Sequence, residues 1–99
     1  MVVVKDIHVR RRGDGKLEAE AIVTATSGDS ITSADMDVNT IEAVTAIIPL
    51  VASHVVTGVA ITNPGSYNNS FTITAYSVSG GSLVTMGGSI DWFIKIIGE

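Results

Sequence analysis

The chain contains no cysteine, few aromatic residues and, over half of its length, no charge. Without cysteine neither a disulfide nor a thiolate metal site can form, and nothing indicates the redox compartment. Between Glu42 and Asp91 there is no Asp, Glu, Lys or Arg, whereas soluble domains carry charge on about a quarter of their residues. This neutral segment must therefore either be covered by another surface or be solvated through Ser, Thr, Asn and the backbone alone.

The charge that is present is mostly acidic and mostly N-terminal. The net charge is −4 and the pI is near 4.9, which argues against a nucleic-acid partner and against an anionic membrane surface. The stretch 43–62 is long enough to cross a membrane, but it contains Pro49, His54 and Gly58 and has no basic flank. The first residues also lack the pattern of a signal peptide. We therefore expect no membrane partner.

Length and composition predict a single all-β domain. The 99 residues are 45% hydrophobic but only 5% aromatic, and Val, Ile, Thr, Ser and Gly dominate, a mixture that favours strands and turns. We expect a small antiparallel β-sandwich or barrel-like domain over 1–99. It would comprise an N-terminal hairpin at 2–26, a turn-rich connection at 27–40 and a charge-poor β core at 41–97.

The N-terminal hairpin is predicted from alternation and from its turn residues. Apolar and polar residues alternate through 16–26, which is the period of a strand. Gly13-Asp14-Gly15 suits a three-residue turn with Gly15 in the left-handed conformation. The resulting register pairs Arg10 with Glu18, His8 with Glu20, Val9 with Ala19 and Ile7 with Ala21, so that polar residues face polar and apolar face apolar.

The segment 41–50 is ambiguous. Asn39 and Glu42 have the spacing of a capping box and Pro49 would end a helix, which allows one short helix near 40–48. Val44, Thr45, Ile47 and Ile48 are β-branched and the segment is short, which favours a strand. We favour the strand and leave the helix open.

The rest of the chain predicts further strands at 54–62, 71–78, 83–86 and 90–97, separated by Gly-, Asn- and Pro-containing turns. Two of these strands are apolar on both faces: 55–61, and the last strand, where Phe93 and Ile97 lie opposite the Trp92 face. A sandwich of this size has one interior, so the second face needs cover, for which a partner subunit is the simplest source. The predicted subunit interface comprises Val55, Val59, Ile61, Trp92, Phe93, Ile94, Ile96 and Ile97.

Two motifs are more simply explained by local structure than by ligand binding. Arg12-Gly13-Asp14 is the tripeptide that integrins recognise, but the turn itself requires Gly-Asp-Gly. Residues 35–39 match the first five positions of an EF-hand loop, yet Thr40 and Ala46 stand where Gly and Glu are needed. We expect these carboxylates to form side-chain turns.

No set of residues indicates catalysis. His8 shares a strand face with Asp6 and Arg10 but has no nucleophile beside it, and His54 has only apolar neighbours. No phosphate-binding glycine loop or hydrolase motif occurs, and Asn68-Asn69-Ser70 is only a formal glycosylation sequon. We therefore expect no enzyme activity, no metal and no cofactor.

The C-terminal half has a family likeness. Residues 58–67, then Phe71-Thr-Ile-Thr-Ala-Tyr, then the closing segment 90–99 resemble the small Thr/Ser/Gly-rich β-domains of phage and archaeal virus particles. The likeness covers residues 38–99 and is one of style, without a diagnostic motif. It implies a homo-oligomeric virion component in head decoration, capsid or tail, commonly a trimer in decoration proteins, that contacts other virion proteins.

The sequence thus predicts a non-enzymatic virion structural protein that assembles through subunit contacts, located in the virion or, alternatively, in the cytoplasm. The alternative function is a monomeric β-sandwich module that binds a glycan or peptide through the loop 64–70. The residues expected to make exposed loop contacts are Arg12, Asp14, Tyr67 and Asn68.

Overall fold

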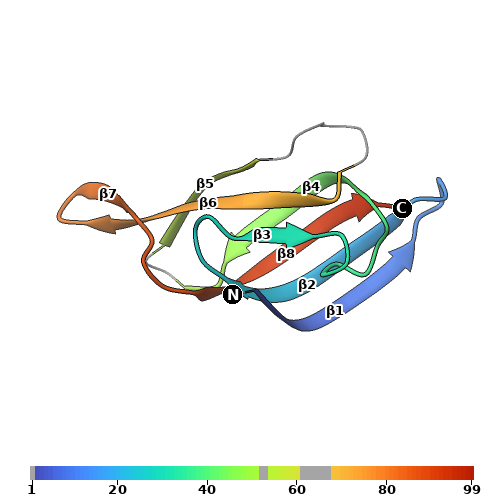
Figure 1. Cartoon of the computed structure of the whole chain (residues 1–99), viewed down its shortest axis with the longest axis horizontal. Helices are drawn as coiled ribbons and strands as arrows, with labels where there is room; N and C mark the ends of the chain where they lie inside the picture. The colour runs from blue at the N-terminus through green and yellow to red at the C-terminus, as the bar shows by residue number, and fades with distance from the viewer. Residues whose placement is uncertain (1, 52–53, 61–67) are drawn as a thin grey trace.

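Two antiparallel sheets pack against each other in the computed structural model of the chain (Figure 1). The structure describes residues 2–51, 54–60 and 68–99, with the backbone alone at 54–60, 78 and 79. The first sheet has the strand order β1-β2-β8-β4, and the second has the order β3-β6-β5 with β7 paired to β6. The strands are β1 (Val3–Arg11), β2 (Leu17–Ala25), β3 (Ser30–Thr32), β4 (Ile41–Pro49), β5 (His54–Ala60), β6 (Ser70–Ser79), β7 (Ser82–Thr85) and β8 (Ile90–Gly98). The predicted all-β sandwich is confirmed.

The N-terminal hairpin has the register that its alternation predicts. All four predicted cross-strand pairs are present between β1 and β2. Gly15 has a φ of 85°, and the Arg12 N–H donates to the Lys16 carbonyl at 2.7 Å to close the turn. A bulge between Val4 and Asp6 interrupts the pairing near the start of β1.

The ambiguous segment is strand β4, and the helix allowed near 40–48 does not form. Pairing with β8 decides this, because β4 aligns along it from Ile41 to Pro49 with two bulges. The possible cap residue Asn39 uses its backbone N–H to bond the Glu99 carbonyl at 2.7 Å. The β-branched residues therefore extend the first sheet instead of turning a helix.

The connection 27–40 contains a strand that the sequence analysis did not predict. Strand β3 pairs with β6, and its central residue Ile31 is fully buried. Three residues are too few to show an alternation. After β3, the Asp35 carboxylate accepts the Thr32 N–H at 2.9 Å while the Thr32 hydroxyl accepts the Asp35 N–H at 3.1 Å. The expected side-chain turn is confirmed for Asp35.

The core lies between the two sheets and is centred on β8. Trp92, Ile94 and Ile96 are 0% exposed, and the Trp92 indole donates to the Ala25 carbonyl at 2.9 Å. The alternate residues of β6, Phe71, Ile73 and Ala75, belong to the same buried cluster. The prediction that Trp92, Ile94 and Ile96 form a subunit interface is therefore wrong, because the chain's own second sheet covers them. Phe93 and Ile97 point to the other face and are half-buried.

The end of β6 and strand β7 form an arm, which we define as residues 76–85. At its base Tyr76 and Ser77 also pair with β5, and beyond Ser77 the arm has two strands. Here β6 pairs with β7 through a turn in which Gly80 and Gly81 have φ values of 58° and 82°. Two consecutive left-handed residues form the type I′ turn that matches the twist of a hairpin. Figure 1 shows the arm extending along the long axis beyond the ends of the first sheet's strands.

Candidate functional site

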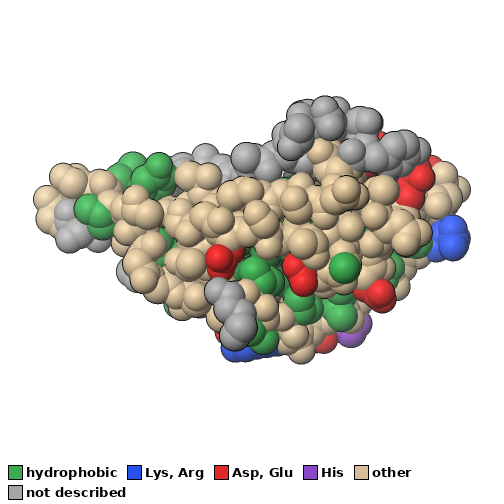
Figure 2. All heavy atoms as spheres, in the orientation of Figure 1, with side chains coloured by type: hydrophobic (Ala, Val, Ile, Leu, Met, Phe, Trp, Pro, Cys, Tyr) green, Lys and Arg blue, Asp and Glu red, His purple; other side chains and the backbone are tan. Residues whose placement is uncertain are grey.

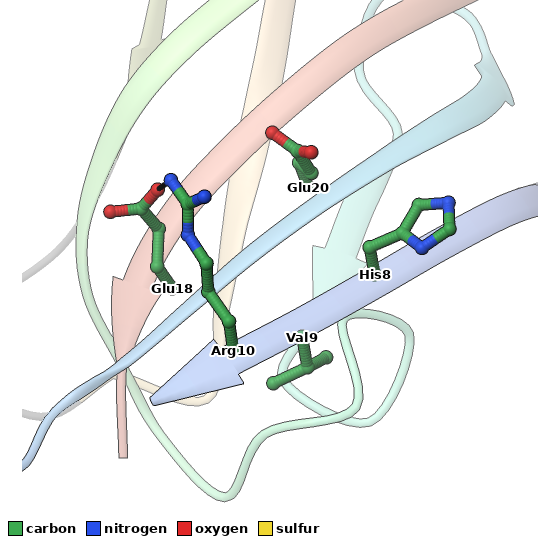
Figure 3. Close-up of a pocket in the computed structure, with 5 residues that line it drawn as sticks. All are labelled: His8, Val9, Arg10, Glu18 and Glu20. Carbon is green, nitrogen blue, oxygen red and sulfur yellow. Dashed lines mark hydrogen bonds and ion pairs between the residues drawn. The ribbon is translucent and has the colours of Figure 1, made fainter. Parts of the chain in front are cut away.

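A shallow hollow of about 320 Å³ lies on the outer face of the first sheet (Figure 3). It is lined by residues of β1 and β2, namely His8, Val9, Arg10, Glu18 and Glu20. The register explains this grouping, because Arg10 lies opposite Glu18 and His8 lies opposite Glu20. Four of its five lining residues are ionisable, which makes it a candidate for chemistry.

Glu18 is held ionised by two cations from neighbouring strands. Lys95 on β8 donates to its carboxylate at 2.8 Å, and Arg10 on β1 donates to the same oxygen. These bonds, first that from Lys95 and then that from Arg10, lower the pKa of Glu18 to about 2. The hydrogen bond with Glu18 also raises the pKa of Arg10. Neither Glu18 nor Arg10 exchanges a proton near neutral pH, so neither acts as a general acid or base. Together with Lys95 they link strands β1, β2 and β8.

The remaining lining residues do not complete a catalytic arrangement. His8 lies 3.2 Å from the Asp6 carboxylate, and both side chains are well exposed. Figure 3 shows the His8 ring and the Glu20 carboxylate extending from neighbouring strands, while Arg10 reaches towards Glu18. Ser, Cys and Thr are missing from the residues that line this hollow. The hollow is an open, charge-compensated surface.

The described residues offer no metal site and no membrane-spanning helix. Among the residues whose side chains the structure describes, no group of three or more His, Asp or Glu is placed to bind a metal ion. In the EF-hand-like segment, Asp35 already caps a turn. Within the same residues, none of the secondary structure is a helix of the length and hydropathy required to cross a bilayer.

The Arg12-Gly13-Asp14 tip is held together by its own contacts. The Asp14 carboxylate accepts the Lys16 N–H at 3.1 Å and lies 3.5 Å from the Arg12 guanidinium. Asp14 is exposed and Arg12 is half-buried. The carboxylate thus stabilises the turn, and loop contacts by these two residues stay a prediction.

Asn68 is buried and links the segment before β6 to β4 of the first sheet. Its side-chain amide donates to the Ile41 carbonyl at 3.2 Å, and the two backbones exchange hydrogen bonds of 2.7 and 3.0 Å. Only 6% of Asn68 is exposed, so the prediction that it makes an exposed loop contact is wrong. The other predicted loop residue, Tyr67, lies outside the described residues, as do Ile61 and the side chains of Val55 and Val59.

Exposed large hydrophobic residues gather at one end of the molecule. This apolar end comprises the arm together with the strand ends that surround its base. Val3 and Leu50 lie level with Asp91 at the start of β8, and Ile48 lies opposite Phe93. The apolar end holds six of the seven such residues in the described chain: Val3, Ile48, Leu50, Val51, Leu83 and Val84, the exception being Val9.

The opposite end of the molecule is charged. It contains the β1–β2 turn, the start of β4 and the end of β8, where Lys16 pairs with Glu42. Figure 2 shows hydrophobic side chains on the arm at the left, while the visible Lys, Arg, Asp and Glu side chains lie over the rest of the molecule. Lys5 pairs with Asp91 near the base of the arm, so the contrast along the 47 Å long axis is between the charge-free arm and the charged opposite end.

Leu83 and Val84 are not among the residues predicted to form the subunit interface. A signal was available, since adjacent residues of a strand point to opposite faces and cannot both enter one core. Leu83 is 57% and Val84 is 43% exposed.

Searches against models of protein families, curated proteins and solved structures returned no match.

Proposed function

We propose that the chain is a non-enzymatic structural subunit that assembles through contacts of its apolar end. The observation that carries the proposal is the gathering of exposed Leu, Ile and Val side chains at this end. Isolated hydrophobic residues are normal on a protein surface, whereas a group of them marks a site of association. The segment between Glu42 and Asp91, which supplies most of this end, contains no charge that burial would desolvate.

The arm supports the same function. Beyond Ser77 the arm has only two strands, and a two-stranded hairpin alone is marginally stable in water. All four residues of β7 are exposed. Contact with another subunit would cover the arm and supply the apolar burial that it lacks. The virion is the setting that the resemblance of residues 38–99 implies, with the chain as a capsid-decoration, capsid or tail subunit.

The proposal is tested by size-exclusion chromatography with light scattering over a dilution series that reaches micromolar concentration. We expect a mass above 10.3 kDa that falls on dilution. A monodisperse monomer at every concentration would overturn the proposal and direct attention to the glycan- or peptide-binding alternative. The virion setting is tested separately by the neighbouring genes, among which portal, terminase or capsid genes are expected.

A further inference from the structure

We propose that the partner of the arm is a second copy of this chain, and that two copies pair antiparallel through β7 across a two-fold axis. The inference rests on the proposed function and names the partner and the contact. It follows from three features: the direction of the β7 backbone groups, the distribution of charge, and the position of Val84.

The hydrogen bonds of the arm show which backbone groups of β7 point outward. The Met86 N–H donates to the Ala75 carbonyl at 3.3 Å, so residues 75 and 86 form a hydrogen-bonded pair. Such pairs alternate with non-bonded pairs along an antiparallel ladder. Val84 and Ser82 therefore bond to β6, while Leu83 and Thr85 direct their N–H and C=O groups away from it. In the described chain β7 pairs with β6 alone, which leaves this outer edge available.

The outer edge of β7 is complementary to itself. If Leu83 of one copy pairs with Thr85 of the other, each pair exchanges two backbone hydrogen bonds, and Val84 lies opposite its own equivalent on the axis. Val84 then occupies a non-bonded pair position, where Cα atoms are about 4.5 Å apart and side chains touch. The two second sheets would join into one continuous sheet, and the 43% exposed Val84 would be covered.

Charge favours contact between two apolar ends over contact between an apolar end and a charged end. A head-to-tail arrangement would place Leu83 and Val84 against the end that holds Arg11, Lys16 and Glu42, and would desolvate these charges. A two-fold contact leaves both charged ends in water. It is also closed, so it produces a defined dimer and not a filament.

The test is a charge swap at the axis. Val84→Lys and Val84→Glu each place like charges opposite each other, so each variant alone is expected to be monomeric, while an equimolar mixture regains the dimer through Lys–Glu pairing. Val9→Lys is the matched control, because Val9 is an exposed valine at the charged end. It should leave the dimer unchanged. Sedimentation velocity gives the masses, and near-ultraviolet circular dichroism of Trp92 reports the fold.

The outcomes separate the two proposals. Monomeric single variants with a dimeric mixture support the two-fold β7 contact. A wild-type oligomer that survives Val84→Lys, a trimer such as the resemblance implies, or monomeric variants that do not recover on mixing would overturn this contact and leave the proposed assembly function standing. A wild-type chain that is monomeric at all concentrations would overturn both.

Discussion

Strand β1 at the edge of the first sheet and strand β7 at the tip of the second differ in length, charge and regularity. Strand β1 has nine residues, carries Lys, Asp, His and Arg side chains, and is interrupted by a bulge. Strand β7 has four residues, no charge and no bulge in its pairing with β6. Charge and bulges are the devices by which proteins keep edge strands from pairing with other chains. The comparison indicates that one edge is protected and the other is left open for contact.

The sheets also differ in what they contribute to stability. Trp92 of the first sheet is fully buried, whereas Leu83 of the arm is 57% exposed. We expect Trp92→Ala to cost about 3–5 kcal/mol of unfolding free energy. In contrast, Leu83→Ala should change it by less than about 0.5 kcal/mol while weakening self-association. Urea unfolding at a concentration where the chain is monomeric measures both values. A large loss with Leu83→Ala would show that the arm belongs to the core.

Gly98 lies at the charged end, where the end of β8 packs closely against the start of β4. A Cβ at this position would lie 2.1 Å from the Thr40 carbonyl oxygen, a backbone atom that cannot move aside freely. We expect Gly98→Ala to cost about 1–3 kcal/mol through overpacking, with no effect on association through the arm. Gly87→Ala is the matched control, because a Cβ there meets no atom within 4 Å. Equal stability of the two variants, measured by thermal unfolding, would contradict this interpretation.

Replacing three of the polar, ionisable side chains of β1 should reduce the difference between the two edges. In the triple variant Asp6→Thr, His8→Thr and Arg10→Thr, the exposed outer face of β1 loses its charges and gains a β-former. We expect species larger than those of the wild type by light scattering at equal concentration. Single replacement of Arg11 by Lys keeps the charge and serves as control. An unchanged mass distribution would mean that charge does not protect this edge.

The smallest expected effect is the acid sensitivity of the Glu18 contacts. The pKa of Glu18 is lowered from 4.5 to about 2 in the folded chain, so the stability it contributes is present above its unfolded pKa and is lost as the pH falls towards 2. The pKa of Asp91, bonded to Thr24 and Lys5, is also lowered. Glu18→Gln should reduce the loss of unfolding free energy between about pH 5 and about pH 2. Glu20→Gln is the control. An equal reduction with this variant would contradict the assignment of the acid sensitivity to Glu18.

Patterns between neighbouring residues predicted the local structure well. The alternation in 16–26 and the Gly-Asp-Gly turn were sufficient to predict every cross-strand pair tested in the hairpin. The alternation of β8 also predicted that Trp92, Ile94 and Ile96 share one face. The alternation does not predict which surface covers this face of β8. The covering strand β6 is brought against it only by the tertiary fold. The same reason explains Asn68, whose partner Ile41 is distant in sequence.

The candidate assembly surface was predicted only in part. The absence of charge pointed to the half of the chain that holds the exposed Leu83 and Val84, but three of the five residues chosen in β8, Trp92, Ile94 and Ile96, are core residues. Hydrophobicity alone does not distinguish a residue that faces a core from one that faces a partner. Strand β3 escaped prediction because only Ile31 of its three residues is buried.

The order of the strands along the chain has a consequence for folding kinetics. Strand β8 lies in the middle of the first sheet between β2 and β4, yet it follows all the other strands in the sequence. Pairing Leu17 with Gly98 requires the closure of a very long loop, which is slow, whereas a hairpin such as β6–β7 closes in about 1–10 μs. The β6–β7 hairpin can therefore close before β8 completes the core of the sandwich. An unpaired strand edge in a partly folded chain can pair with other chains. The chain concentration during folding therefore matters more than that during storage for the balance between ordered assembly and aggregation.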